Sequence, residues 1–563
     1  MKQIIECVPN FSEGRDMSII KQITDVIETV DGVKLLDVDP GAATNRTVVT
    51  IVGTPDEVCE AAFLAVKKAS EIIDMSKHKG AHPRFGATDV CPLIPVSNIS
   101  MEETVKFAHK LAERIGNELN IPIFCYESAA RTPKRRNLAN CRSGEYEALA
   151  KRIITDEWKP DFGSNVWDDH TMRTGATAVG ARNFLVAYNI NLNTTSTNKA
   201  NSIAFDVRER GRVKREGHPI IGKIVLDEKG NKVNEPGLLK SVKAIGWYIE
   251  EYGVAQISMN LTDISVTPVH VAFDTVCDRA AANGLRVTGS ELVGVMPLNS
   301  ILDAGKYFLK KQGRSTGIAD AEIIKIAVKS LGLDELKPFD PKKNIIEYMM
   351  EDDSTKKLID MDLTEFCHTT ASEAPAPGGG SIAAYMGSLG AALGTMVANL
   401  TAHKHRHSDI WLDYSDWAEK GKYYHDMLLK MVDEDTNAFN EIMEAFGLPK
   451  GSDDAKAIRK QAIQDATKYA IEIPLQTMKL CCDSMEVMLE MAKIGLEASI
   501  SDAGVGALAA RAGVMGAFLN VKINTGGYDD KVFVEKVLKE GAEIEKKAIE
   551  IEKQVLELVN SKI

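Results

Sequence analysis

The pattern of hydrophobic and polar positions divides the chain into two halves of different character. Up to about residue 330, short apolar runs typical of strands are interleaved with stretches of helical period. Beyond about residue 357 almost everything has helical period, and strand signals vanish. We therefore expect an α+β first half followed by an all-α helical-bundle domain.

The first half uses one order of elements twice. The opening order is strand, helix, strand, strand, helix, strand, which defines a ferredoxin-like unit, and it recurs after residue 181 without any residue-level repeat. Two such sheets facing each other would leave a groove, a common place for a ligand. The expected elements of the first unit are strands at Gln3–Pro9, Val33–Asp39, Arg46–Gly53, Asp89–Val96 and Ile121–Tyr126, and helices at Met17–Val30, Pro55–Met75 and Met101–Leu119.

These patterns predict four segments. They are a first subdomain at 1–180, a second at 181–330, a Pro- and charge-rich connector at 331–356 and a helical domain at 357–563. Two stretches fall outside the regular patterns. Trp158–Gly180 reads as a long loop, and Gly211–Gly237 as an exposed hairpin-like excursion.

One apolar run in the second half has the length of a membrane span. Ile382–Leu400 contains nineteen residues without a charge. It is rich in Ala, Gly and Ser and poor in large apolar residues, so we favour a soluble core helix and expect no membrane span. Gly387, Gly390 and Gly394 would mark the face where another helix comes close. A second small-residue helix at Gly504–Asn520 suggests a tight and possibly oligomeric bundle.

Composition narrows the functional classes. A net charge of −12 and a pI of about 5.6 argue against nucleic-acid binding but allow anionic small substrates. The nine cysteines are scattered without a CxxC pair, which indicates a reducing compartment and a cytoplasmic protein. The segment from His403 to His407 could suggest a metal site. Its intervening cations favour a solvated basic segment, and we expect no metal.

Two regions carry candidate chemistry. In the first, His78, His82 and Arg84 lie in a Gly/Pro-rich loop that leads into a strand. A histidine held in such a loop could exchange protons near neutral pH, or it could simply cover the strand end.

In the second region, Asp435 falls on an apolar helical stripe built from Leu428, Val432, Phe439, Ile442 and Phe446. A carboxylate there is either a general acid–base with a raised pKa or half of a structural ion pair, with a residue such as Arg511 as its partner. The run Gly378–Gly379–Gly380 before a helix is either an anion cradle or a linker.

Long motifs in both halves resemble one enzyme family, the formimidoyltransferase-cyclodeaminases. ECVPNFSEGRD, LLDVDPGAATNRTVVTIVG, IDMSKHKGAHPRFGATDVCPLIPV and ARNFLVAYNINL resemble its transferase half. APGGGSIAA, VDEDTNAF, SDAGV and GAFLNVKIN resemble its cyclodeaminase half. The resemblance covers nearly the whole chain. It implies two ferredoxin-like subdomains with a folate tunnel, a helical domain, and a large ring-like homo-oligomer.

The resemblance also implies two reactions. The first moves a formimino group from N-formimino-L-glutamate to N5 of tetrahydrofolate, with His82 as the proton shuttle. The folate, polyglutamylated in our expectation, is the co-substrate. The implied folate-binding positions are Gly163, Ser164, Asn165, Val166, Trp167, Gly175 and Ala176, supported by Asp39, Asn10, Arg46 and Arg84.

The second implied reaction closes 5-formiminotetrahydrofolate to 5,10-methenyltetrahydrofolate and releases ammonia. Asp435 matches the catalytic aspartate, and Gly378, Gly379 and Gly380 would seat part of the folate. Leu496 stands where the family usually has an asparagine. The alternatives are a methenyltetrahydrofolate cyclohydrolase-like helical domain, which this region also resembles, and a non-catalytic folate-binding scaffold.

Overall fold

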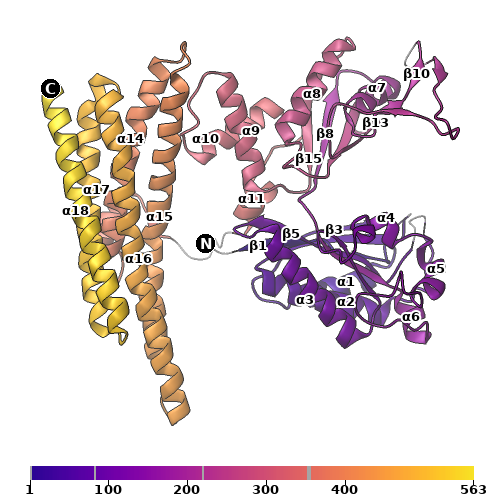
Figure 1. Cartoon of the computed structure of the whole chain (residues 1–563), viewed down its shortest axis with the longest axis horizontal. Helices are drawn as coiled ribbons and strands as arrows, with labels where there is room; N and C mark the ends of the chain where they lie inside the picture. The colour runs from indigo at the N-terminus through magenta and orange to yellow at the C-terminus, as the bar shows by residue number, and fades with distance from the viewer. Residues whose placement is uncertain (1–2, 43, 81–83, 218–220, 351–356) are drawn as a thin grey trace. The chain divides into compact units, whose positions relative to one another are not determined.

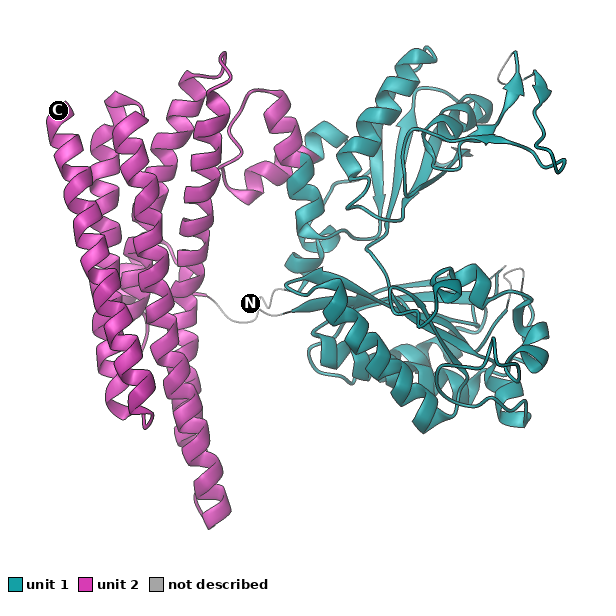
Figure 2. Ribbon diagram, in the orientation of Figure 1, with its two compact units in different colours: residues 1–304, 328–351 teal, residues 305–327, 352–563 magenta. Residues whose placement is uncertain are grey.

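The protein forms two compact units in the computed structural model, which describes residues 3–42, 44–80, 84–217, 221–350 and 357–563 (Figures 1 and 2). Unit 1 consists of Met1–Ala304 and Val328–Glu351, and unit 2 of Gly305–Ala327 and Asp352–Ile563. Unit 1 combines sheets with helices, and the described residues of unit 2 form helices and connecting loops without a strand. This confirms the expected fold class.

The first sheet of unit 1 has the strand neighbours of a ferredoxin-like unit. β3 pairs with β4, β4 with β1, and β1 with β5, all antiparallel. One face of this sheet packs on helices through a core that includes Ile5, Cys7 and Ile51. The elements are β1 (Ile4–Cys7), β2 (Asn10–Phe11), α1 (Met17–Ile27), β3 (Lys34–Gly41), β4 (Arg46–Gly53), α2 (Pro55–Ile72), β5 (Thr88–Ser97) and α3 (Met101–Leu119).

This sheet is larger than the sequence pattern predicted. β7 (Thr177–Ala181) lies parallel between β5 and β6 (Ile123–Glu127), and α6 (Asp169–Thr174) precedes it. The prediction of a continuous loop over Trp158–Gly180 was therefore wrong. β7 reads Thr-Ala-Val-Gly-Ala, which carries little strand propensity, and the neighbouring strands impose its conformation. The short helices nearby are η1 (Pro133–Arg136), α4 (Leu138–Cys141) and α5 (Glu145–Arg152).

The second sheet of unit 1 repeats the ferredoxin-like order, as predicted. Its strands run β13-β14-β8-β15, all antiparallel, and α7 and α8 accompany them. The excursion at 211–237 contains two short hairpin pairings, β9 with β12 and β10 with β11. The elements are β8 (Val186–Leu192), α7 (Thr197–Val207), β9 (Arg212–Val213), β10 (Arg215–Glu216), β11 (Lys223–Ile224), β12 (Asn234–Glu235), β13 (Val242–Ile249), β14 (Val254–Leu261), α8 (Val269–Ala282) and β15 (Val287–Val293).

The described part of the expected connector packs against unit 1. Ile345 and Ile346 are fully buried, and Lys34 Nζ donates a hydrogen bond to the Met349 carbonyl. Residues 351–356 lie outside the described residues, and the domain boundaries predicted from the sequence stay predictions. The helices here are α9 (Leu298–Lys311), α10 (Asp320–Leu331), α11 (Pro341–Asn344) and α12 (Ile346–Met349).

Unit 2 is built around the close approach of two helices, α14 and α17. A side chain on Gly390 would lie 2.6 Å from the Gly506 carbonyl oxygen, and one on Gly506 would lie 2.9 Å from that of Gly390. The predicted role of the small residues is confirmed here. The helices are α13 (Leu363–Thr370), α14 (Gly379–Lys404), α15 (Trp411–Gly447), α16 (Asp453–Ile494), α17 (Ile500–Asn524) and α18 (Lys531–Lys562), with η2 (Leu358–Asp360), η3 (Glu497–Ser499) and η4 (Thr525–Gly527).

By length and apolar composition alone, α14 and the stretch Glu497–Gly527 could each cross a membrane. At least half of each apolar window is buried inside unit 2, as in the core helices of a soluble bundle. The apolar stripe predicted on α15 is buried only in part. Leu428 and Val432 are fully enclosed, whereas Phe439 and Phe446 are exposed. Helical spacing gave the correct face but could not show how far the neighbouring helices cover it.

Candidate active sites

A cavity of about 930 Å³ lies in unit 1 and draws its lining from both sheets. Asn10 and Arg46 come from the first sheet, and Lys243 and Thr262 from the second. Arg142 follows α4, between β6 and β7 of the first sheet, and Arg182 lies on the segment that joins the two sheets. The predicted groove between two ferredoxin-like subdomains thus exists as a ligand-sized cavity, although the residues that line it were mostly not predicted.

At one wall of this cavity two guanidiniums share one buried carboxylate, while the lining as a whole carries the cations Arg46, Arg142, Arg182 and Lys243 and the acids Glu127, Glu145 and Asp263. The Arg46 and Arg142 guanidiniums both contact the buried carboxylate of Asp89, at 3.2 Å (Nη2 to Oδ2) and 2.8 Å (Nε to Oδ1) respectively. One carboxylate cannot neutralise two guanidiniums, and burial also lowers the pKa of Arg46 from its usual value. An anionic ligand would supply the missing negative charge.

A buried acid lies near the same cavity. Burial raises the pKa of Glu6 to about 7, although the positive charge of Arg182 acts in the opposite direction. Glu6 is on β1, two residues before Val8, which lines the cavity. A carboxyl group with a pKa near neutrality can exchange a proton at physiological pH.

The loop before β5 is held by hydrogen bonds at both ends. Arg84 donates from Nη1 to the carbonyls of Met75 and His78, both at 2.9 Å, and pairs with Glu147 at 2.7 Å. His78 Nε2 is 2.8 Å from the Asn45 carbonyl. His82 lies outside the described residues, so its predicted role stays a prediction. Arg84 supports this loop and is not among the residues lining the cavity.

The predicted folate segment is well anchored, but its described residues do not line the large cavity. At Gly163 φ is +78°, and a side chain would lie 1.9 Å from the Ile121 carbonyl oxygen. Ser164 Oγ donates to the Val166 carbonyl, and the Trp167 ring packs edge-on against Tyr146. Asn165 is exposed, Gly175 and Ala176 are buried beside Gly86 and Phe85, and Asp39 is exposed on β3.

The second candidate site is a pocket of about 170 Å³ in unit 2. Asp435 comes from α15, Gly378, Gly379 and Gly380 from the start of α14, and Asn520 and Asn524 from α17. Sequence reasoning identified the first four of these residues and missed both asparagines. Asn520 does lie within the GAFLNVKIN motif, so a sequence signal was present.

The Asp435 carboxylate is held in one orientation. Its Oδ2 accepts hydrogen bonds from the Ser381 N–H at 2.8 Å and from the Ser381 hydroxyl at 3.0 Å. Burial raises the pKa of Asp435, while these two hydrogen bonds act in the opposite direction. A hydrogen bond to a charged group contributes roughly 1.5–3 kcal/mol, and the net rise in pKa shows that desolvation outweighs both. Among the described residues, no ion-pair partner contacts this carboxylate.

The neighbouring acids and the alternative cation have other partners. Asp433 accepts the Leu358 N–H at 2.7 Å, and Glu434 accepts the Tyr469 hydroxyl. Arg511 pairs instead with Glu552, with Nε 3.0 Å from Oε2. The proposed ion pair between Asp435 and Arg511 is therefore wrong, and the acid–base role of Asp435 stays a prediction.

The three glycines differ in what surrounds them. A side chain on Gly380 would lie 2.0 Å from Asp435 Oδ1, and one on Gly379 would meet the Asn520 amide at 3.4 Å. Around Gly378 there is nothing within 4 Å. Gly380 is thus needed for the carboxylate to approach α14. Leu496, the departure from the family pattern, does not line the pocket, and its N–H donates to Thr401 Oγ1.

Within the described residues, no group of three or more His, Cys, Asp or Glu side chains is placed to hold a metal ion. His405, in the basic segment considered for metal binding, stacks on Tyr414 with ring centroids 5.5 Å apart.

Three family models match successive parts of the chain. The N-terminal subdomain of the formiminotransferase domain matches residues 4–182, the formiminotransferase domain 187–351, and the formiminotransferase-cyclodeaminase model 362–543. A formimidoyltransferase-cyclodeaminase of Dictyostelium discoideum is 42% identical over 564 residues, covering 100% of both chains.

Relatives with a single region also match. A glutamate formimidoyltransferase of Streptococcus pyogenes is 39% identical over 310 residues, covering 55% of this chain and 94% of the relative. A methenyltetrahydrofolate cyclohydrolase of Methylorubrum extorquens is 39% identical over 198 residues, covering 35% of this chain and 95% of the relative.

The first prediction concerns the cost of the buried carboxylate. A folded-state pKa above the unfolded value of about 4 means that ionised Asp435 costs stability. This cost is absent at low pH, grows as pH rises above the unfolded pKa, and levels off above the folded pKa. We expect Asp435→Asn to leave the free energy of unfolding at pH 7 unchanged or higher, as measured by denaturant melts at pH 4 and pH 7. A loss of roughly 3–5 kcal/mol would instead indicate a broken buried ion pair.

The second prediction separates the glycines. Gly380→Ala places a methyl group against Asp435 Oδ1, so it should displace the carboxylate from Ser381 and destabilise the protein by about 1–3 kcal/mol, as overpacking does. Gly378→Ala is the matched control and should change stability by less than about 1 kcal/mol, because its methyl group meets open space. Thermal melts of both variants provide the comparison. Equal stabilities would show that Gly380 does not shape the Asp435 site.

Proposed function

Because this chain belongs to the formimidoyltransferase-cyclodeaminase family, we propose that it is a bifunctional enzyme of histidine degradation. It transfers the formimino group from N-formimino-L-glutamate to tetrahydrofolate. It then cyclises 5-formiminotetrahydrofolate to 5,10-methenyltetrahydrofolate and releases ammonia. One observation carries this proposal: the chain unites, at full length, two regions that occur separately in the single-region relatives.

The transfer reaction suits the cavity of unit 1, whose lining includes four cationic side chains. N-formimino-L-glutamate carries two carboxylates, and Arg46, Arg142, Arg182 and Lys243 all line the cavity. Carboxylates bound there would present the formimino carbon to N5 of the folate. As N5 attacks, its proton must leave, and the glutamate nitrogen must gain one before the C–N bond breaks. We assign this proton transfer to His82, as the family resemblance implies.

The cyclisation suits the pocket of unit 2. N10 attacks the carbon of the protonated amidine and then loses its proton, and the resulting amino nitrogen gains that proton and departs as ammonia, which leaves the methenyl cation. Ser381 donates two hydrogen bonds to Oδ2 of Asp435, and Oδ1 accepts no hydrogen bond from the described residues. We therefore assign the shuttle to Oδ1, which would take the N10 proton and return it to the departing nitrogen. Burial supports this role, because it raises the pKa of the carboxyl toward neutrality.

A supply of both substrates tests the proposal directly. Full-length protein given N-formimino-L-glutamate and tetrahydrofolate should form methenyltetrahydrofolate, which is measured by its absorbance. It should release one equivalent of ammonia for each methenyltetrahydrofolate formed. The Methylorubrum relative favours a second candidate, hydrolysis of methenyltetrahydrofolate in the helical region. Hydrolysis without ammonia release from 5-formiminotetrahydrofolate would support that candidate. Folate binding without turnover would indicate a scaffold.

Three further properties are part of the proposal. The folate carries a polyglutamyl tail, and the open, cation-lined cavity is compatible with additional carboxylates. No metal takes part. The protein is cytoplasmic, which is supported by the nine cysteines, all of which are free thiols.

We also propose that the chain assembles into a large ring-like homo-oligomer through an apolar surface on α14 and α17. A side chain added at Gly516 or Gly506 of α17 would lie 3.8 Å from Met386 or 3.4 Å from Leu393 of α14, so the two helices meet along one seam, which we infer their exposed apolar stripes flank. Contiguous apolar surface of this kind typically marks an interface. The exposed residues of the two stripes are Leu389, Met396, Leu400, Val505, Leu508, Leu519 and Ile523.

The third prediction separates the two reactions by mutation. His82→Ala should slow formimino transfer by on the order of 10²–10⁴-fold, as loss of a general acid–base does, and leave cyclisation of supplied 5-formiminotetrahydrofolate intact. Asp435→Asn should abolish ammonia release and leave transfer intact. Lys21, exposed on α1 of the same unit and outside both sites, provides a control, since Lys21→Ala should affect neither rate. Near-normal transfer by a folded His82→Ala protein would refute its assignment.

The fourth prediction concerns assembly. Leu519→Glu puts a charge into the apolar seam and should shift the protein to smaller species in sedimentation velocity. Val532→Glu is the control, since Val532 is also a strongly exposed apolar residue but lies on α18, outside the two helices of the seam. The proposed interface is wrong if Leu519→Glu sediments as the wild type does.

A further inference from the structure

One segment belongs to the transferase region by sequence and to the helical unit by its contacts. The formiminotransferase family model covers residues 187–351, which include Gly305–Ala327. Those same residues are grouped with unit 2, where they lie against α15 (Figure 2). The sequence Ser-Thr-Gly-Ile-Ala-Asp, residues 315–320, provides most of the contacts that we describe here. We call these six residues the strap.

The centre of the strap fits α15 backbone against backbone. A side chain on Gly317 would lie 2.3 Å from the carbonyl carbon of Ala418, 2.5 Å from its Cβ and 2.6 Å from its oxygen. Ala418 is itself fully buried. On the other side, Asn399 Nδ2 of α14 donates to the Gly317 carbonyl at 2.8 Å. Only glycine can occupy position 317 without moving the helix.

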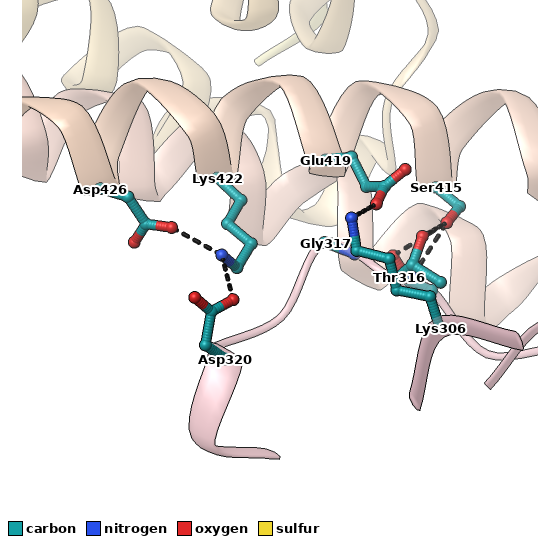
Figure 3. Close-up of polar contacts among 9 residues, drawn as sticks. Lys306, Thr316, Gly317, Asp320, Ser415, Glu419, Lys422 and Asp426 are labelled. Atoms are coloured by element: carbon teal, nitrogen blue, oxygen red, sulfur yellow. Dashed lines mark hydrogen bonds and ion pairs between the residues drawn. The ribbon is translucent and has the colours of Figure 1, made fainter. Parts of the chain in front are cut away.

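Buried hydroxyl groups fix the register of the strap. Ser415 Oγ accepts the Thr316 N–H at 3.0 Å and lies 3.1 Å from Thr316 Oγ1 (Figure 3). Both side chains are fully buried. If the strap left, Ser415 would lose these partners, and each buried polar group left unsatisfied costs roughly 1–3 kcal/mol.

Ion pairs hold the strap and the helix that precedes it. Lys422 Nζ lies 2.7 Å from Asp320 Oδ1 and 2.6 Å from Asp426 Oδ2, and its side chain is largely buried (Figure 3). Lys306 of α9 pairs with Glu419 at 2.5 Å. Removal of Lys422 would leave two carboxylates without their shared counter-charge, whereas removal of Asp320 would release the strap from a lysine that still pairs with Asp426.

We propose that the face of α15 formed by Ser415, Ala418, Glu419 and Lys422 is a dedicated docking surface for the strap. The transferase region thereby contributes a structural part of the helical unit. Comparison with a single-region relative supports this role for the surface. The cyclohydrolase relative is only about as long as the helical region, so it has no transferase segment to dock, whereas the fused chain does. This inference rests on contacts alone and is independent of the reactions proposed above.

Hydrogen–deuterium exchange of the full-length protein, resolved by peptide, tests the proposal. Gly317→Val cannot fit against Ala418, so amides of residues 315–327 and 411–426 should exchange about tenfold faster or more, as expected when a local contact opens. Gly447→Val is the matched control on the same helix, because nothing lies within 4 Å of Gly447. It should leave both peptides at the wild-type rate. Wild-type exchange in Gly317→Val would overturn the proposal.

A double-mutant cycle tests whether Asp320 and Lys422 hold the strap through one interaction, even if Gly317→Val does not fold. Asp320→Asn and Lys422→Met should each speed exchange of the strap peptide. The double variant should be no worse than the more severe single variant, because both remove one interaction. Effects that simply add would show that Asp320 and Lys422 act separately and would overturn the docking surface.

Discussion

Unit 2 depends on the close approach of α14 and α17 at their glycines. Where Gly390 faces Gly506, the two backbones are separated by less than a side chain would require. The same contact continues toward the start of α14, where Gly379 lies beside Asn520 of α17. Packing of the helices therefore creates the pocket, because the residues that allow the backbones to meet continue into the residues that line it.

The pocket holds a carboxylate away from water, although an ionised carboxylate is normally more stable in water. Leu428 of α15 packs near Gly387 of α14, which brings Asp435 of the same helix to Ser381. Burial alone would make the ionised carboxylate costly, and the two hydrogen bonds from Ser381 reduce this cost without removing it. The balance leaves the pKa of Asp435 above its usual value, as the proton transfer proposed for it would need. This is the property that cyclisation with loss of ammonia requires.

Unit 1 uses the opposite electrostatic arrangement. There Asp89 is the buried group, and Arg46 and Arg142 surround it from two different parts of the chain. The surplus positive charge faces a cavity large enough for an anionic ligand. The overall charge of −12 gives no indication of this, since a binding site responds to the local arrangement of charges and not to their sum.

Much of the fold follows from local sequence. Helix α3 begins and ends where its pattern predicts, because Ser100 and Glu103 form a capping box at its start and Asn120 adopts a left-handed conformation at its end. Both ferredoxin-like orders and the helical second half follow from periodicity. Asp435 could be identified as a candidate acid–base from its position on an apolar helical stripe, and the family resemblance pointed to the same residue. Asn10 and Arg46, chosen by resemblance, do line the cavity.

Other features were decided only by tertiary structure. β7 has weak strand propensity and exists because β5 and β6 flank it. Arg142 and Lys243 reach one cavity from distant segments, and Gly317 docks on Ala418 about a hundred positions away. Sequence periodicity reports which face of an element is buried. Which distant element covers that face, and therefore whether Asp435 meets Arg511 or Ser381, is decided by packing of the folded chain.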